Sequence, residues 1–273
     1  MLFTKRKLLA FSVVLIICSI AIYKYFIKKP LISVVITSYN YAQYLPETFD
    51  SVLAQTYKDY EVIVVDDGST DNSLQIIKNY ADKYKNFYLY QHDGGINKGL
   101  IESMKLGIEK SKGVFIAFLE SDDMWREDKL SEIVKIIKKN PDAVIISNGA
   151  IPFGDDFFGI KETQIYLLDI ERRLKEKNII SPDEDILFNV IPTFSAVTIK
   201  TDVLKELDFN TPKTAVLDLW LYRQIYKNYP LYHTSKTLTK WRKHIKSYGA
   251  TQNKDTEKEK NILLNKFQEK FMK

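Results

Sequence analysis

The sequence predicts an α/β fold with a doubly wound, mostly parallel sheet, and three observations support this prediction. Short apolar runs rich in β-branched and aromatic residues recur through the first half of the chain after residue 30. Segments with apolar residues at helical spacing alternate with these runs. The runs also end in small, polar or acidic residues. Alternating strands and helices are typical of parallel βαβ units, and open sheets of this kind bind ligands at the carboxyl ends of their strands.

The composition fits one large domain with a mixed surface. Hydrophobic residues make up 45% of the 273 residues, which is enough for a substantial core. The net charge is +5, but the 40 basic and 35 acidic residues are interspersed along the chain. This pattern predicts a solvated surface and no nucleic-acid partner, while a phosphorylated substrate or an anionic membrane remains compatible. The single cysteine, Cys18, excludes an intrachain disulfide and a cysteine-based zinc site.

We expect residues 1–29 to form a tail and a membrane anchor, with a helix over residues 8–27. This stretch is almost uninterrupted apolar sequence, and with Lys24 snorkelling it reaches the ~20 residues that a spanning helix needs. A cleaved signal peptide is the alternative, because Ser19 and Ala21 resemble a small-residue cleavage site. Basic residues are balanced on the two sides of the apolar run, so the positive-inside rule leaves its orientation open.

The elements of the first half follow from continuous apolar runs for strands and from helical spacing for helices. In order they are a strand within 31–40, a helix over 44–57, a strand over 60–65, a helix over 74–84 capped by Asp71 or Asn72, a strand over 87–90, a turn over 92–95, a helix over 101–110 and a strand over 114–119. Because parallel strands end at the same edge of a sheet, we expect the tips near Thr37, Asp66 and Glu120 to lie along one edge.

Three carboxylates, Glu120, Asp122 and Asp123, follow the apolar run over 114–119. Burying a lone carboxylate costs several kcal/mol or forces it to protonate, so these side chains should lie beyond the end of the strand, facing water or a cation. The alternative is that Ser121–Asp123 caps a helix that begins near Glu127, since serine and aspartate are favoured caps.

Two common phosphate-binding patterns are absent from the sequence. No GxGxxG and no GxxxxGK[ST] follows any expected strand, so neither a dinucleotide fold nor a P-loop is supported. Gly94, Gly95, Lys98 and Gly99 form a glycine-and-lysine loop that would be able to approach phosphates, with a plain turn as the alternative.

Three segments in this order and spacing resemble the family-2 glycosyltransferases, which have the Rossmann-like GT-A fold: Ser33–Asn40 (SVVITSYN), Gln55–Thr56 with Tyr60–Asp71 (YEVIVVDDGSTD), and Gly113–Trp125 (GVFIAFLESDDMW). The resemblance implies an inverting hexosyl- or N-acetylhexosaminyl-transferase in polysaccharide biosynthesis. The expected donor is a nucleotide sugar, in the first place a UDP-sugar, and the expected acceptor is a glycan, a lipid-linked sugar or a protein. Mn²⁺ or Mg²⁺ is the implied cofactor.

The resemblance also implies where the nucleotide lies. Thr37 and Tyr39, followed by Asn40, would line the base, and Asp67 would accept a hydrogen bond from the uracil ring. The family often carries Arg and Asn where this chain has the Met104–Lys105 pair. Lys98 is therefore the expected substitute for the missing diphosphate contacts.

Further along, Glu120 stands where the family usually has Asp, as a longer contact to ribose or metal, and Asp122 or Asp123 would ligate the metal. Physical chemistry supports a metal here independently. A nucleoside diphosphate leaves readily only when its developing negative charge is neutralised, and a hard divalent cation held by carboxylates does this directly.

In the second half we expect a helix over 127–139, a strand over 143–147, an exposed loop over 153–158, a charged helix over 169–177 and a charged amphipathic helix over 251–273. The loop carries Asp155 and Asp156. Residues 192–200 resemble the family strand that follows the acceptor loop, and residues 238–247 resemble its closing motif. The implied boundaries are 30–250 for the GT-A domain, with the nucleotide half ending near 125 and the acceptor half over 126–250.

Asp218 is the best candidate for the catalytic base, because residues 218–225 resemble the helix that carries this base in the family. Ala215 and Val216 occupy the places of the usual acidic pair, which leaves the register of this helix open. If Asp218 is not the base, Asp155, Asp156 and Glu184 are the next candidates. The alternative is that Asp218 caps its helix. At the closing motif, Arg242 would pair with phosphate and His244 would join the metal or the β-phosphate, with a lone surface histidine as the alternative.

Two rival functions remain open from the sequence. The first is a catalytically inactive relative that binds a glycan or a partner, and the second is a nucleotidyltransferase on a similar sheet. We expect the catalytic domain to lie on the cytosolic face of a membrane, or in the Golgi lumen if the protein is eukaryotic, because these compartments supply nucleotide sugars.

Overall fold

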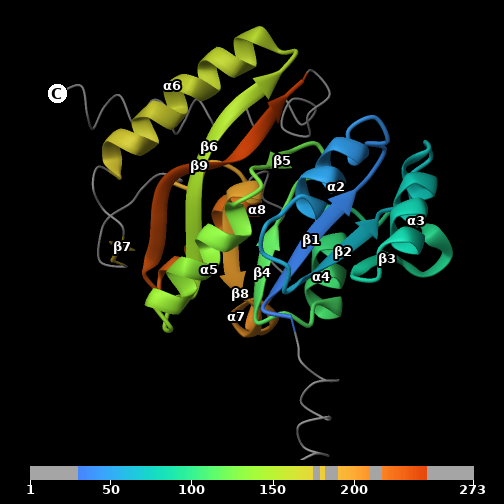
Figure 1. Ribbon diagram of the computed structural model, residues 1–273, viewed down its shortest axis with the longest axis horizontal. Coiled ribbons are helices and arrows are strands. Elements are labelled where there is room, and N and C mark those ends of the chain that lie inside the picture. Colours follow the sequence, from blue (N-terminus) through green and yellow to red (C-terminus); the bar gives the residue numbers. More distant parts are fainter. Residues whose placement is uncertain (1–29, 175–178, 182–189, 210–216, 245–273) are drawn as a thin grey trace, which may run out of the picture.

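The computed structural model describes residues 30–174, 179–181, 190–209 and 217–244, which form one mixed α/β structure around a single sheet (Figure 1). The sheet has the strand order β3-β2-β1-β4-β8-β6-β9-β5, with β7 paired to β9. The expected anchor over 8–27, Glu184 and the expected helix over 251–273 lie outside the described residues. Within the described residues no helix is long and apolar enough to cross a membrane.

The first half of the chain forms the expected parallel sheet. Its strands are β1 (Ile32–Ser38), β2 (Tyr60–Asp66), β3 (Phe87–Gln91) and β4 (Phe115–Phe118), and every pairing among them is parallel. The helices are α2 (Leu45–Leu53), α3 (Ser73–Lys83) and α4 (Leu100–Lys110), with the short turn η1 (Asp93–Gly95) before α4. All seven residues of β2 are buried, as a strand covered on both faces requires.

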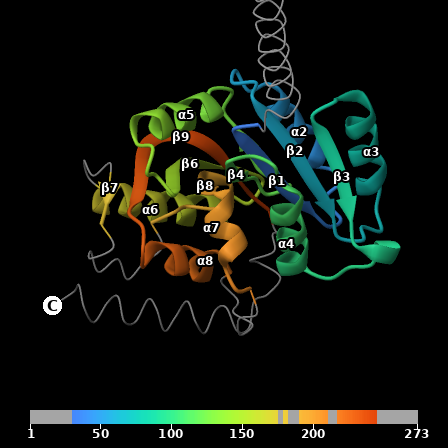
Figure 2. The same cartoon turned by 90° about the horizontal axis from the view of Figure 1, so that it is seen from below.

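The helices divide between the two faces of the sheet according to the alternation of side chains along the strands. Val34 and Val62 pack with apolar residues of α2 and α3, whereas their neighbours Val35 and Ile63 pack with Met104 of α4. Figure 2 shows α2 on one side of the sheet together with α5 (Lys129–Lys139), and α4 on the other side together with α7 (Thr201–Glu206) and α8 (Leu217–Tyr226). Helices therefore cover both faces of the sheet, and the ends of the strands are the places where a ligand would bind.

The second half departs from the expected parallel arrangement. Strand β8 (Val197–Lys200), which follows the short turn η2 (Phe194–Ala196), runs antiparallel between β4 and β6 (Ile145–Gly154). The long strand β9 (Leu231–Lys243) is parallel to β6 but antiparallel to β5 (Met124–Trp125) and β7 (Ile179–Ile180). The sheet is thus mixed, because this half of the chain does not repeat the regular strand-helix alternation of the first.

Two local predictions are wrong. Residues 153–158 are largely exposed, as expected, but they are not one loop: β6 extends to Gly154, and Asp156 caps α6 (Phe157–Arg173) by accepting a hydrogen bond from the Gly159 amide at 3.0 Å. The helix expected over 169–177 therefore begins much earlier. The structure also rules out the alternative in which Ser121–Asp123 caps the following helix, since β5 intervenes and α5 begins only at Lys129.

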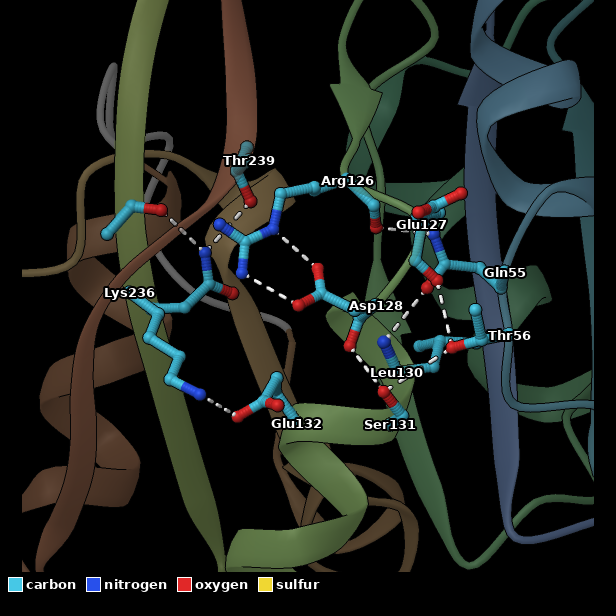
Figure 3. Close-up of polar contacts among 12 residues, drawn as sticks. Gln55, Thr56, Arg126, Glu127, Asp128, Leu130, Ser131, Glu132, Lys236 and Thr239 are labelled. Atoms are coloured by element: carbon cyan, nitrogen blue, oxygen red, sulfur yellow. Dashed lines mark hydrogen bonds and ion pairs between the residues drawn. The ribbon is translucent and has the colours of Figure 1, made fainter.

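A buried amide ties the end of α2 to the segment between β5 and α5 (Figure 3). Gln55 is fully buried, and its Nε2 donates to the carbonyl oxygens of Arg126 at 2.8 Å and Ser51 at 3.0 Å. Its Oε1 accepts from the Leu130 amide at 2.9 Å. The Thr56 amide donates to the Glu127 carbonyl oxygen at 2.8 Å. Gln55 and Thr56 therefore hold in place residues 126–130, the segment that follows the carboxylates of residues 120–123.

Replacing Gln55 with alanine should lower the free energy of unfolding by about 2–4 kcal/mol, because it leaves a buried N–H and a buried carbonyl oxygen without these partners. Gln75→Ala is the matched control: Gln75 is exposed on α3 and its Nε2 donates to Asn79 Oδ1, so the change should stay within about 0.5 kcal/mol. Urea denaturation measures both. Equal losses in the two variants would show that the Gln55 amide does not hold this segment.

Candidate active site

The strand ends that were expected to meet do lie along one edge of the sheet. Ser38 at the end of β1 is in register with Asp66 at the end of β2, and Val35 of β1 is in register with Phe118 at the end of β4. The residues that follow these strands include Tyr39, Asp67 and Glu120. Parallel pairing thus gathers the three motifs at one place, which is the carboxyl edge where open α/β sheets bind ligands.

Residues Glu120–Asp123 form a tight turn, named here the acidic turn, in which the Asp123 amide donates to the Glu120 carbonyl oxygen at 3.1 Å. Asp123 points inward and is only 1% exposed. Its Oδ1 accepts from the Arg242 amide at 2.7 Å, and its Oδ2 accepts from Thr193 Oγ1 at 3.5 Å. Burial, followed by the charges of Asp122 and Glu120, raises the pKa of Asp123 well above its usual range. Asp123 is placed to hold the turn together from inside.

Asp122 points the other way and meets His244. The Asp122 Oδ2 and His244 Nε2 atoms lie 3.0 Å apart, although the residues are far apart in the sequence. The His244 ring packs against the rings of Tyr44 and Tyr41, with centroids at 4.7 and 5.8 Å. These contacts fix the imidazole. The structure therefore brings together an oxygen and a nitrogen ligand that the sequence assigned to a metal.

Glu120 keeps contact with solvent but is held by two residues that the sequence analysis did not single out. Thr193 Oγ1 donates to Glu120 Oε2 at 2.5 Å, and the Glu120 amide donates to Ser195 Oγ at 2.9 Å. Desolvation of the carboxylate by the surrounding protein, followed by the negative charge of Asp122, raises the pKa of Glu120 to about 7. Thr193 and Ser195 lie within the PTFSA stretch before β8, where only their short polar side chains in an apolar context gave a signal.

Asp218 lies in the first turn of α8, close enough to the site for its charge to act on Glu120. Its negative charge contributes to the raised pKa of Glu120 and to that of Tyr166 on α6, so the carboxylates of Asp218 and Glu120 are near enough to interact. Of the alternative bases, Asp156 is engaged as the cap of α6, and Asp155 lies where its charge acts on Tyr44.

Arg242 acts as a clamp on the acidic turn. Its Nε donates to the Asp122 carbonyl oxygen at 2.6 Å, and its Nη2 pairs with Glu47 at 2.5 Å. The guanidinium also lies 4.8 Å from the Tyr44 ring and 4.3 Å from the Phe153 ring. The sequence assigned this guanidinium to phosphate, whereas the structure commits it to a carboxylate, a carbonyl oxygen and two rings.

At the other end of the edge, Asp67 organises the glycine-and-lysine loop. Its carboxylate, 4% exposed, accepts from the backbone amides of Lys98 and Gly99 at 2.8 and 2.9 Å. Gly68 has φ +72°, and a Cβ there would lie 2.7 Å from the Asn97 nitrogen, so only glycine lets the loop pack this closely. The carboxylate assigned to the uracil ring already has two backbone donors, and the Lys98 side chain is exposed.

Asn40 holds the loop beside the first motif. It has a left-handed backbone (φ 58°), which asparagine tolerates, and its Oδ1 accepts from the Thr70 amide at 2.7 Å. Tyr39 is 45% exposed next to it, and Thr37 lies one strand position before Ser38, in register with Val65. The Tyr39 ring is therefore exposed at this end of the sheet edge, whereas the Asn40 side chain already hydrogen-bonds within the protein.

A fully buried lysine lies behind the acidic turn, at a position that no motif in the sequence marks. Lys129 Nζ donates to the Ser195 carbonyl oxygen at 2.6 Å, to Asn148 Oδ1 at 2.7 Å and to Thr239 Oγ1 at 3.1 Å. Burial lowers the pKa of the ammonium well below its usual range, opposed by the charge of Asp123. The Ser195 carbonyl oxygen also accepts from Trp125 Nε1 at 2.8 Å. Lys129 and Trp125 therefore fix the backbone of Ser195, whose side chain bonds the Glu120 amide.

This sheet, with the acidic turn after β4 and, beside it, the histidine that follows β9, defines a GT-A-type glycosyltransferase fold, and solved structures share it. The protein TarS of S. aureus, solved in complex with UDP-GlcNAc, aligns with a TM-score of 0.64 at 22% identity over 81% of this chain and 60% of its own. The mannosyltransferase PcManGT of Pyrobaculum calidifontis, solved with GDP-Man and Mn²⁺, aligns with a TM-score of 0.59 at 18% identity over 82% and 60%.

The chain belongs to glycosyl transferase family 2, whose sequence model matches residues 33–204. An uncharacterised glycosyltransferase of Rickettsia prowazekii is 36% identical over 57% of this chain and 46% of its own length. The putative teichuronic acid biosynthesis glycosyltransferase TuaG of Bacillus subtilis is 36% identical over 38% of this chain and 40% of its own. The matched region is therefore less than half of either relative.

Proposed function

We propose that this glycosyltransferase moves a sugar from a nucleotide sugar, in the first place a UDP-sugar, to a hydroxyl group of a glycan, lipid-linked or protein acceptor with inversion at the anomeric carbon. The observation that carries the proposal is the Asp122–His244 pair beside Glu120, at the edge where the strand ends of the nucleotide half converge. The complexes of TarS with UDP-GlcNAc and of PcManGT with GDP-Man support a nucleotide sugar as the donor.

The residues present fit a divalent metal. Asp122 Oδ2 and His244 Nε2 lie 3.0 Å apart, so a carboxylate oxygen and an imidazole nitrogen would both be available to hold the ion. Within the described ranges no group of three or more His, Cys, Asp or Glu residues could hold a metal by itself. Phosphate oxygens and water normally complete such a shell. When bound, Mn²⁺ or Mg²⁺ would neutralise the negative charge of the departing diphosphate.

The other residues have separate tasks in this proposal. Glu120, held by Thr193, faces the ribose and the metal, and Arg242 keeps the acidic turn in place. Asp218 takes the proton from the acceptor hydroxyl as that oxygen attacks the anomeric carbon from the side opposite the leaving group. Tyr39 offers an exposed ring to the base.

Calorimetric titration of the chain with UDP and with GDP, each with and without Mn²⁺, tests the donor class. The proposal predicts binding that depends on Mn²⁺ and is tighter for UDP. A preference for GDP would keep the mechanism and change the donor. Absence of metal-dependent binding by both nucleotides would remove the proposed donor site.

We further propose that residues 8–27 anchor the protein in a membrane with the catalytic domain on the cytosolic face, where nucleotide sugars are made. The apolar run and its flanking lysines support the anchor. Protease added to intact bacterial spheroplasts should leave the catalytic domain whole. Digestion of that domain without lysis would place it outside.

A further inference from the structure

Tyr222 carries a hydroxyl group that the packing of the protein does not explain. The residue is 5% exposed, and its buried hydroxyl oxygen has no hydrogen-bond partner among the residues that the structure describes. Buried polar groups in native proteins are nearly always paired, because an unpaired one costs stability. A phenylalanine would fill the same space without that cost. Unpaired groups of this kind are found where a protein gives up stability for function.

The position of Tyr222 connects it to both carboxylates of the proposed reaction. Asp218 and Tyr222 are four residues apart on α8 and therefore share one face of the helix. The Tyr222 ring packs against Phe194, with centroids 5.7 Å apart. The neighbours of Phe194 on both sides, Thr193 and Ser195, are the residues that hydrogen-bond Glu120. Tyr222 thus lies next to the segment that holds Glu120 and on the same helix face as the candidate base.

The electrostatic surroundings keep the hydroxyl protonated. Burial, followed by the negative charges of Asp218 and Glu120, raises the pKa of Tyr222 well above its usual range. Its hydroxyl is therefore a neutral hydrogen-bond donor among carboxylates, which only accept when ionised. A sugar hydroxyl that enters between the carboxylates would need one such donor.

We infer that Tyr222 is a specificity-determining residue whose hydroxyl donates a hydrogen bond to a sugar hydroxyl at the reaction centre. The inference rests on the proposed function. A site built to bond a hydroxyl rejects an analogue that lacks it, since the buried donor then stays unpaired. Tyr222 would therefore favour sugars with a hydroxyl at one position over their deoxy analogues.

The test compares Tyr222→Phe with Tyr60→Phe, which removes an equally buried hydroxyl that is satisfied. Tyr60 is 6% exposed, lies away from the site, and donates to the Val52 carbonyl oxygen at 2.9 Å. Tyr60→Phe should lower Tm and leave kcat/KM unchanged. Tyr222→Phe should leave Tm unchanged or raise it, while kcat/KM falls roughly 10–100-fold, the loss expected for one hydrogen bond to a reacting ligand.

Binding measurements identify which sugar is contacted. If Tyr222 bonds the donor sugar, Tyr222→Phe weakens binding of the UDP-sugar but not of UDP. If it bonds the acceptor, donor binding is unchanged and the acceptor KM rises. Tyr222→Phe with full activity, or with a loss of Tm like that of Tyr60→Phe, would overturn the inference. A wild-type protein without any turnover would instead overturn the proposed function, and this inference with it.

Discussion

Asp122→Asn is expected to abolish Mn²⁺-dependent nucleotide binding and to lower kcat by roughly 10²–10⁴-fold, the loss expected when several kcal/mol of metal-borne charge stabilisation is removed. Asp122 is the carboxylate of the acidic turn that faces His244, and its Oδ2 lies 3.0 Å from Nε2. An amide is a poor ligand for a hard cation, but it has nearly the same shape as the carboxylate. The thermal stability of the variant should therefore stay close to that of the wild type.

Two further variants make this prediction specific. Asp123→Asn should keep binding within about tenfold, because Asp123 is buried and bonded to the Arg242 amide, and asparagine resembles the protonated form that burial favours. Asp82→Asn, an exposed change on α3, should have no effect. Calorimetry with UDP and Mn²⁺ measures all three. Equal losses in Asp122→Asn and Asp123→Asn would make both carboxylates ligands and contradict the division of roles within the turn.

Asp218→Asn should lower kcat by roughly 10²–10⁴-fold, as is typical when a general base is removed, and leave the affinity for UDP unchanged. The base acts on the acceptor hydroxyl, so its loss affects the chemical step and not the nucleotide. Asp218 is in the first turn of α8, and its charge acts on Glu120 across the site.

Asp155→Asn is the comparison that locates the base. Asp155 follows β6 and lies near Tyr44, but the account gives it no part in the proton transfer. Steady-state assays should show near-normal turnover for Asp155→Asn and a large loss for Asp218→Asn. The reverse result would move the base to Asp155 and leave Asp218 with a structural task at the start of α8.

The sequence was most informative where local patterns decide structure. The first four strands of the sheet and the helices between them begin and end within a few residues of the predicted positions, except α2, because continuous apolar runs and helical spacing are properties of short segments. Once these strands are taken to pair in parallel, that pairing alone predicts that Tyr39, Asp67 and Glu120 lie at one edge of the sheet.

Prediction was weaker where the structure depends on contacts between distant segments. The antiparallel insertion of β8, the length of β6 and the start of α6 follow from strand pairing, which no local pattern reveals. The same holds for the site. Lys129, Thr193 and Ser195 gain their roles only when α5, η2 and the acidic turn come together, and Arg242 meets Glu47 from almost the other end of the described chain.

The most direct test of the account is release of nucleotide from nucleotide sugars. The chain is incubated with a panel of UDP- and GDP-sugars and Mn²⁺, and free UDP or GDP is measured with and without a chelator. We expect UDP release from at least one UDP-sugar, lost with the chelator and in Asp122→Asn. No release from any donor, with no nucleotide binding in the presence of Mn²⁺, would contradict the claim that this chain is a metal-dependent transferase of nucleotide-activated sugars.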